Sequence, residues 1–169
     1  MTDNQPRIAM ITGGNSGIGF ATVRKLVAQG FHVILASRNQ QASAQAIKQI
    51  HDDNPNAIVE SIPLDLASFA SIRACAARLQ AKGYPPHTLI TNAGGAVPGK
   101  QASFTADGFE MTFGTNHLGH FLFTNLLLED LKRSAPARVI TVASELHNPD
   151  YARGPAPDFD YDNLKGEKY

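Results

Sequence analysis

The sequence is short of the features that would place the chain in a membrane, on nucleic acid or outside the cell. It contains one cysteine, Cys75, so no disulfide can form within the chain, which fits a reducing compartment. Lysine and arginine together number 15, as do aspartate and glutamate, so no net positive charge attracts nucleic acid or anionic lipid. The longest apolar stretch, FLFTNLLL at 121–128, is interrupted by polar residues and is far shorter than the roughly 20 residues of a membrane span. Because the first seven residues are polar and carry no signal core, we expect a cytoplasmic protein with no nucleic-acid or membrane partner.

Short apolar runs alternate with helical patterns along most of the chain. The apolar runs occupy residues 7–12, 31–37, 57–64, 87–94 and 137–144. The helical patterns occupy residues 18–29, 40–50, 68–82 and 107–133. Strands that alternate with helices form right-handed βαβ units, in which helices cover both faces of a parallel sheet. The sequence therefore predicts an α/β fold of the Rossmann type, a doubly wound parallel sheet of about five strands with helices on both faces. Cys75 lies in the apolar-rich stretch IRACAARL and is expected to be buried.

The predicted sheet is incomplete. A doubly wound dinucleotide fold normally has about six strands, whereas the fifth apolar run is followed by the segment 148–169, which is rich in proline and aspartate. The fifth strand would keep a bare apolar edge, which favours aggregation. We interpret residues 1–147 as a nucleotide-binding domain and residues 148–169 as an irregular tail that leads toward a missing C-terminal part.

A glycine-rich turn joins the first predicted strand to the first predicted helix. In ITGGNSGIG, Gly13, Gly17 and Gly19 have the spacing G-x-x-x-G-x-G. Glycine allows a tight turn whose main-chain N–H groups can approach a diphosphate, and the start of the following helix favours negative charge. The alternative is a glycine-rich turn that binds nothing. The position between a strand and a helix, at the start of the alternation, favours a dinucleotide-binding turn.

Five segments, in order along the chain, resemble motifs of the short-chain dehydrogenase/reductase family. TGGNSGIG at 12–19 matches the family pattern T-G-x-x-x-G-I-G, and LDL at 64–66 resembles the adenine-contacting segment. TNAG at 91–94, TNHLGHFLFT from Thr115 and RVITVAS at 138–144 resemble the later motifs. The segments ASELHNPD and PDFDYDNLKGEKY resemble the retinol-dehydrogenase-like and protochlorophyllide-reductase-like members. On these residues the chain is identified as similar to the N-terminal part of such a protein.

The resemblance implies a nicotinamide dinucleotide cofactor and the residues that bind it. These are Thr12, Gly13, Asn15, Ser16, Gly17, Ile18, Gly19, Ser37, Arg38, Asp65, Leu66, Asn92, Ala93 and Gly94. Asp65 would accept a hydrogen bond from the adenine amino group. Family members move a hydride between nicotinamide and a carbonyl or alcohol carbon. Ser144 would bond the substrate oxygen, and Asn116 would support a catalytic lysine through its backbone and a bound water. The alternatives are a strand-end serine that bonds its own loop and an ordinary polar residue within a helix.

The end of the second predicted strand distinguishes NADP(H) from NAD(H). In dinucleotide folds that bind NAD, a carboxylate at this place bonds the ribose hydroxyls. This chain has Ser37 followed by Arg38 instead. An arginine can form charge-assisted bonds to a 2′-phosphate and can stack on adenine. We therefore favour NADP(H) over NAD(H), the alternative being a solvated surface arginine.

The resemblance also implies a catalytic pair with the pattern Y-x-x-x-K. Tyr161 and Lys165 fit this pattern literally. Prolines precede the segment and Gly166 follows it, so a sustained helix is not expected there. In the resembling subgroups the true pair stands on a helix further on. We therefore predict that the pair belongs to the missing part, and that this chain alone has no appreciable turnover.

Two histidines near the asparagine of the fourth helical pattern could suggest a metal site. His117 and His120 are spaced as metal ligands on a helix can be. No further ligand stands at a suitable spacing, so we expect no metal and expect both rings to pack or to face solvent. A role for His147, close to Ser144 in the sequence, is a hypothesis only.

Three hypotheses about function stay open on the sequence. The first is an NADP(H)-dependent oxidoreductase acting on a small-molecule carbonyl or alcohol, bulky and apolar if the subgroup resemblance holds. The second is a non-enzymatic NADP(H)-binding sensor or regulatory module, and the third is an inert product of truncation. Because the long helix of the intact family often forms a dimer face, the predicted helix at 107–133 is also a possible homodimer interface.

Overall fold

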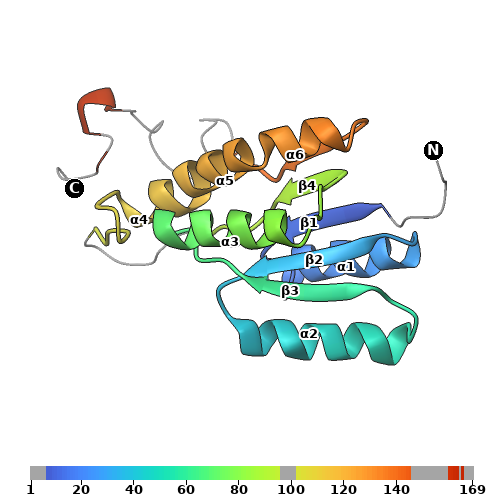
Figure 1. The fold of residues 1–169 in the computed structure, drawn as a ribbon. Helices are drawn as coiled ribbons and strands as arrows, with labels where there is room; N and C mark the ends of the chain where they lie inside the picture. Colours follow the sequence, from blue (N-terminus) through green and yellow to red (C-terminus); the bar gives the residue numbers. More distant parts are fainter. Residues whose placement is uncertain (1–6, 96–101, 146–159, 164, 166–169) are drawn as a thin grey trace.

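The computed structural model describes residues 7–95, 102–145, 160–163 and 165, and these build one parallel sheet with helices on both faces (Figure 1). The strands are β1 (Ile8–Thr12), β2 (His32–Ser37), β3 (Val59–Pro63), β4 (Thr88–Thr91) and β5 (Arg138–Thr141). All neighbours pair in parallel, in the order β3-β2-β1-β4-β5. This confirms the predicted incomplete doubly wound sheet. The strand order reverses at β1, between β2 and β4, and this switch point is where such sheets bind ligands.

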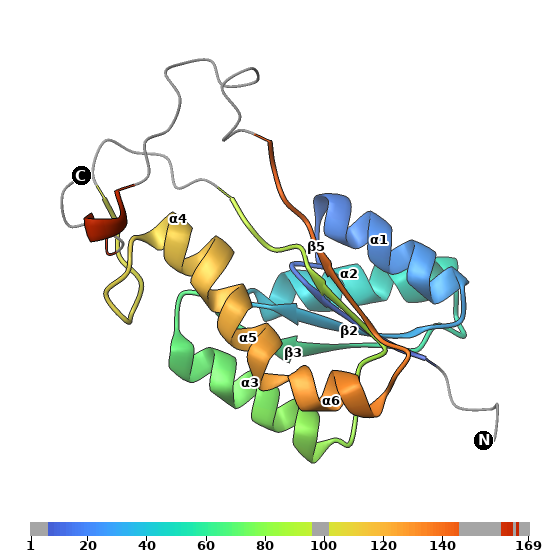
Figure 2. The same ribbon diagram turned by 90° about the horizontal axis from the view of Figure 1, so that it is seen from above.

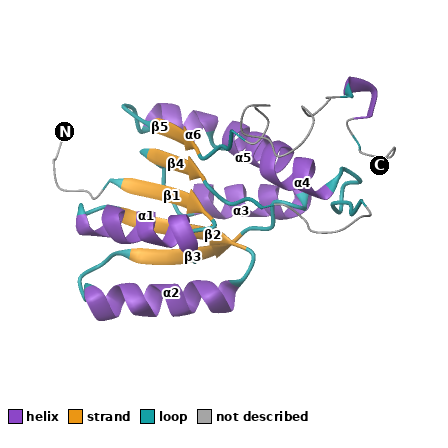
Figure 3. Cartoon of the chain, turned by 180° about the vertical axis from the view of Figure 1, so that it is seen from behind, coloured by secondary structure: helices purple, strands orange, loops and turns teal. Residues whose placement is uncertain are grey.

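The helices divide between the two faces of the sheet, as Figures 2 and 3 show from two further directions. Helices α1 (Gly17–Ala28) and α2 (Gln40–Asp53) cover one face. Helices α3 (Phe69–Ala81), α5 (His120–Leu126) and α6 (Leu128–Arg133) cover the other. None of the helices in the described part of the chain is both long and apolar enough to cross a membrane.

Successive residues of each strand point to opposite faces and so build two separate cores. On β1, Met10 packs into the core beneath α3 and α5, whereas Ala9 and Ile11 pack into the core beneath α1 and α2. Cys75 of α3 is 1% exposed in the first of these cores, as expected. Burial raises the pKa of its thiol to about 12, so the thiolate that would react with oxidants or metals does not form near neutral pH.

The long helix predicted over 107–133 is not a single helix, which corrects that expectation. The segment before it forms an antiparallel bridge between Phe104 and Glu110, and α4 (Met111–Phe113) begins only after Glu110 has capped it. A π-helical turn, η1 (Gly114–Gly119), then joins α4 to α5. The helical pattern of the sequence did not reveal this turn, in which Gly119 approaches the distant Leu66 closely enough to exclude a Cβ.

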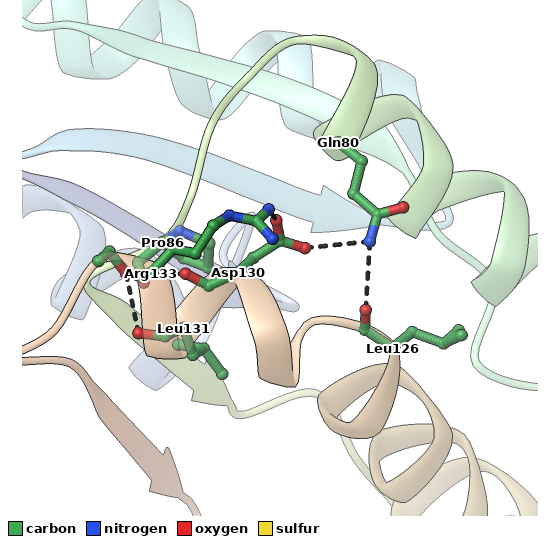
Figure 4. Close-up of polar contacts among 7 residues, drawn as sticks. Gln80, Pro86, Leu126, Asp130, Leu131 and Arg133 are labelled. Carbon is green, nitrogen blue, oxygen red and sulfur yellow. Dashed lines mark hydrogen bonds and ion pairs between the residues drawn. The ribbon is translucent and has the colours of Figure 1, made fainter.

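A second interruption separates α5 from α6 at Leu127, whose φ of −97° and ψ of 1° leave the helical region. Figure 4 shows what holds the two pieces. Gln80 of α3 donates from Nε2 to the Leu126 carbonyl (3.3 Å) and to Asp130 Oδ2 (3.0 Å). The Asp130 carboxylate also pairs with Arg133. Leu127 itself is fully buried, so the break turns its side chain into the core.

The fifth strand is an exposed edge in the described part of the chain. It pairs with β4 alone, and Val139 and Ile140 each keep 45% of their surface exposed. This agrees with the bare apolar edge expected from the sequence. The predicted tail and His147 lie largely outside the described residues. What is described there is a 3-10 turn, η2 (Tyr161–Asn163), and a hydrogen bond from the main-chain N–H of Glu110 to the carbonyl of Lys165 (3.0 Å).

Candidate cofactor site

A groove runs along the carboxyl ends of β1, β2 and β4. One hollow of about 370 Å³ extends from the end of β2 to the π turn, and a second of about 380 Å³ lies against the glycine turn and Val142. Gly13, Asn15, Ala93 and Gly94 line both, so the hollows form one continuous groove. Of the residues predicted to bind cofactor, those lining the groove are Gly13, Asn15, Ser16, Ile18, Gly19, Ser37, Arg38, Asp65, Leu66, Asn92, Ala93 and Gly94. Asn116, predicted to be catalytic, lines it as well.

The glycine turn has the backbone that its sequence predicts. Gly13 and Gly17 have φ values of +66° and +52°, which side chains other than glycine's rarely adopt. A Cβ on Gly19 would lie 2.3 Å from the Gly13 carbonyl oxygen and 2.6 Å from Asn92 Nδ2. These three glycines therefore satisfy three separate requirements, two for conformation and one for close approach. Gly14, which the sequence did not single out, is also closely packed, since a Cβ there would lie 2.3 Å from Leu35 Cδ2 in the core and Leu35 would have to shift.

The start of helix α1 is arranged to receive negative charge. Ser16 stands at the N-cap with extended backbone, and its side chain makes no capping bond within the described structure. The first main-chain N–H groups of a helix lack partners inside the helix, and in the described structure the Ser16 side chain does not accept from them. The described first turn of α1 contains no acidic residue. Ile18, 72% exposed, presents an apolar side chain beside this turn.

At the end of β2, Arg38 is exposed and Ser37 is buried. Arg38 is exposed and lines the groove. The Ser37 hydroxyl is buried and lies 2.5 Å from Ser43 Oγ of α2 and 3.3 Å from the Asn39 carbonyl, to which it donates. Asn39 in turn caps α2 by accepting from the main-chain N–H of Ala42 at 2.9 Å. The Ser37 side chain therefore orders the turn into α2, and the predicted part of Ser37 in cofactor binding stays a prediction.

The segment after β3 forms the wall opposite the glycine turn. Asp65 is half-buried, and its Oδ1 accepts from the main-chain N–H of Ala67 at 3.0 Å, while its own N–H donates to Ser71 Oγ at 2.9 Å. These bonds fix the carboxylate at the groove. The π turn packs tightly on the same segment, since a Cβ on Gly119 would lie 2.6 Å from the Leu66 carbonyl oxygen. Among the lining residues the charged side chains are Arg38 and Asp65.

Hydrogen bonds tie the end of β1 to the segment after β4. Thr12 is fully buried, and its Oγ1 accepts from the main-chain N–H groups of Asn92 and Ala93, each at 2.9 Å. Asn92 Nδ2 donates to the carbonyls of Thr12 (3.0 Å) and Gly13 (3.3 Å). Thr12 and Asn92 were predicted as cofactor residues. Thr12 does not line the groove, and its hydroxyl instead joins the end of β1 to the segment after β4.

Asn116 lies in the π turn, and its side chain is bonded to the segment that follows β4. Its Nδ2 donates to the Gly95 carbonyl at 2.9 Å, and its Oδ1 accepts from the Gly95 N–H at 3.2 Å. Its own main-chain carbonyl accepts from the ring of His120, whose Nδ1 lies 3.0 Å away. The other ring nitrogen of His120, Nε2, lies 2.8 Å from Thr12 Oγ1. His120 is therefore a buried histidine with two uncharged hydrogen-bond partners, whereas His117 stacks on Phe113 and Phe121.

A family model described as short chain dehydrogenase matches residues 7–156, which include every predicted site residue. The chain belongs to the short-chain dehydrogenase family. Mouse retinol dehydrogenase 12 is 47% identical over 141 residues, covering 83% of this chain and 44% of that protein. Human polyprenol dehydrogenase is 45% identical over 146 residues, covering 83% of this chain and 43% of that protein. The structure of Pseudomonas aeruginosa RhlG with NADP superposes with a TM-score of 0.70 at 32% identity, covering 82% of this chain and 54% of that one.

The chain spans less than half the length of these two curated relatives. In this short-chain dehydrogenase chain, the groove is lined by Asn116 and by all the residues predicted to bind cofactor except Thr12 and Gly17, whereas Ser144 is not among the lining residues. Ser144 is exposed and follows the end of β5. Tyr161 is 77% exposed, and the described residues around it form a single 3-10 turn.

Sequence reasoning missed several residues that the groove uses. Met111 and Thr112 line it from α4 and no motif signalled them, and Thr115 lines it from the π turn, where the TNHLGHFLFT motif begins but had suggested no role for it. His120 was expected to pack or face solvent, and its role in joining Thr12 to Asn116 was not anticipated. Its spacing to the buried Phe123 and Leu127 does place it on the inner side of the helix, and this spacing was the available signal.

We expect the stability of the chain to depend on pH through His120. Burial lowers the pKa of its ring below the ordinary value of 6.5, against the smaller opposite effect of the hydrogen bond to Asn116. The folded chain thus binds this proton less readily than the unfolded chain. The ring's contribution to stability is complete above pH 6.5 and is lost as the pH falls below that value toward the folded-state pKa. Urea unfolding above and below pH 6.5 should show a larger loss for the wild type than for His120→Gln, which does not titrate. Equal losses would show that His120 has an ordinary pKa.

Proposed function

We propose that the chain binds NADP(H) and forms the cofactor-binding part of an oxidoreductase that moves a hydride between nicotinamide and a carbonyl or alcohol carbon. The groove carries this proposal. The glycine turn and the start of α1 line one of its two hollows, and Arg38 lines the other. A diphosphate fits the first and a 2′-phosphate fits the second. Asp65 stands on the wall between them as an acceptor for the adenine amino group.

The preference for NADP(H) is supported by charge. Arg38 is exposed in the groove, and the residues next to it at the end of β2, Ser37 and Asn39, are uncharged. A phosphate on the ribose would therefore meet a guanidinium and no carboxylate from this turn. Arginine recognises phosphate through charge-assisted, often bidentate, hydrogen bonds. One relative of known structure, RhlG, is a complex with NADP, and it is 32% identical to this chain over the superposed part.

The residues of this chain have distinct parts in the proposed reaction. The reduced cofactor supplies the hydride. Asn116 shapes the groove beside the glycine turn, and Ser144 supplies a hydroxyl donor for the substrate oxygen. The proton donor and acceptor of the Y-x-x-x-K pattern would come from residues after Tyr169, so we propose that this chain alone has no appreciable turnover. Two relatives are named for retinol and polyprenol, both apolar alcohols, and we propose a substrate of that class.

Titration of the chain with NADPH and NADH, followed by fluorescence, tests the proposed function. We expect saturable binding of both with a lower dissociation constant for NADPH. Equal affinities would overturn the NADP(H) preference, and no binding of either would overturn the cofactor function. Carbonyl reduction by the 169-residue chain that is abolished by Ser144→Ala would contradict the proposed inactivity and would assign Tyr161 and Lys165 to catalysis.

We also propose that the outer side of α5 forms a homodimer interface. Phe121 is 62% exposed, and its ring continues a stack with His117 and Phe113, with ring centroids 6.5 and 5.3 Å apart. A second copy of the chain would cover this stack. Sedimentation velocity should show a dimer for the wild type and a monomer for Phe121→Glu. Ile58→Glu, which places the same charge on an apolar residue 51% exposed near β3, is the matched control and should stay dimeric. A monomeric wild type would contradict the proposal.

A further inference from the structure

A closed circuit of hydrogen bonds runs beneath the groove and passes through His120. The main-chain N–H groups of Asn92 and Ala93 donate to Thr12 Oγ1, which contacts His120 Nε2. His120 Nδ1 contacts the Asn116 carbonyl. The Asn116 side chain closes the circuit on the main chain of Gly95, in the segment where the circuit began. The circuit therefore joins the end of β1, the segment after β4 and the π turn.

The chemistry of the partners determines which atom donates at each step. A hydroxyl has one proton to donate and two acceptor sites. Both N–H groups from the β4 segment use Thr12 Oγ1 as an acceptor, so the hydroxyl proton is directed at His120 Nε2. Nε2 must then be the unprotonated nitrogen of a neutral ring. Nδ1 carries the proton and donates it to the Asn116 carbonyl, which can only accept.

The π turn explains why the main-chain carbonyl of Asn116 is paired with a side chain, the ring of His120. In a π-helical turn the main-chain pairing is widened from the regular i→i+4 pattern. The main-chain N–H of His120 points to the His117 carbonyl, and its ring Nδ1 reaches the Asn116 carbonyl instead. His120 thereby holds the widened turn, while the adjacent Gly119 packs directly on Leu66. The position of the groove wall formed by Thr115 and Asn116 depends on this anchor.

We propose that His120 is a positioning residue for the cofactor, which sets the spacing between the floor of the glycine turn and the wall formed by the π turn. The inference rests on the proposed binding of NADP(H). His120 is 7% exposed and is not among the residues that line the groove, so it acts through Thr12 and Asn116. The neutral ring with its proton on Nδ1 is the form that satisfies both partners.

Three substitutions at His120 separate its two contacts from its volume. His120→Gln keeps an acceptor near the place of Nε2, and His120→Asn keeps a donor near the place of Nδ1. His120→Phe keeps the ring volume and loses both contacts. We expect the dissociation constant of the His120→Phe chain for NADPH to rise about tenfold, the effect of losing a buried hydrogen bond, and those of the other two to rise less.

A matched control and a second measurement distinguish positioning from general stability. His117→Phe alters an exposed ring in the same π turn and should leave the dissociation constant for NADPH unchanged. Thermal unfolding is recorded for every variant, because a purely structural role would lower the unfolding temperature and leave the affinity of the folded chain as it was. If His120→Phe does not fold, the Gln and Asn variants carry the same comparison. Wild-type affinity in all His120 variants that fold overturns the proposal.

Nitrogen-15 NMR of the ring tests the bridge without any cofactor. We expect an unprotonated Nε2 and a protonated Nδ1 in the wild-type chain near neutral pH. A protonated Nε2 would overturn the inferred circuit. If the wild-type chain binds neither NADPH nor NADH, the proposed function fails, and with it the cofactor part of this inference. The ring tautomer still decides separately whether the bridge exists.

Discussion

Gly19→Ala should lower the affinity of the chain for NADPH by at least about a hundredfold, which corresponds to about 2.7 kcal/mol of binding free energy. The added methyl group would stand 2.3 Å from the Gly13 carbonyl oxygen and 2.6 Å from Asn92 Nδ2. Neither neighbour can move freely. Gly13 is part of the glycine turn, and Asn92 Nδ2 is bonded to the carbonyls of Thr12 and Gly13. The turn must therefore open, and its main-chain N–H groups no longer converge on a diphosphate.

The matched control for this substitution is Gly95→Ala. Gly95 lines the same groove, but a Cβ there would meet no atom within 4 Å, and its φ is not in the left-handed region. The same methyl group is thus added to the same groove without a steric conflict. Fluorescence titration should give Gly95→Ala an affinity within about threefold of the wild type, less than 1 kcal/mol. Equal losses in the two variants would contradict the close-approach argument.

Arg38→Asp should reverse the cofactor preference of the chain. We expect the affinity for NADPH to fall roughly a hundredfold, because a charge-assisted hydrogen bond contributes about 1.5–3 kcal/mol and the new carboxylate also repels the 2′-phosphate. The affinity for NADH should be unchanged or should rise, since a carboxylate at the end of the second strand can accept from the ribose hydroxyls. Parallel titrations with the two cofactors measure this directly.

Arg24→Asp provides the control for net charge. Arg24 lies on α1, where its guanidinium pairs with Asp53 on the surface at 2.8 Å. The substitution changes the charge of the chain by the same amount as Arg38→Asp. It should leave the ratio of NADPH to NADH affinity as it is in the wild type. A similar change of this ratio in both variants would show that the general field of the protein, and not the guanidinium in the groove, sets the preference.

The fold and the cofactor groove were largely predictable from the sequence because both depend on local patterns. Alternating apolar runs place the strands, and β3 (Val59–Pro63) falls within the predicted run at 57–64. In a doubly wound sheet the motifs at the ends of β1, β2 and β4 must meet at one edge. Gly13, Gly17 and Gly19 could therefore be assigned to one turn, and Arg38 and Asp65 to the same groove, from the sequence.

What could not be predicted depends on contacts between distant segments. The Ser37 hydroxyl is paired with the hydroxyl of Ser43 of α2, and a strand-end motif does not carry that information. The π turn at Gly114–Gly119 exists where Gly119 packs on Leu66, whereas residue by residue the same segment has an ordinary helical pattern. Gly14 packs closely against the side chain of Leu35, which comes from a different strand.

The bonds from Asn92 and Ala93 to Thr12 have a consequence for hydrogen exchange. Both residues lie beyond the end of β4, in a segment without regular secondary structure. Their main-chain N–H groups nevertheless donate to the hydroxyl of Thr12, a residue that is fully buried. Solvent reaches such protons only when β1 and β4 separate, so they should exchange as slowly as the amides of the central strands. Two loop amides at the cofactor groove would then report the opening of the whole sheet.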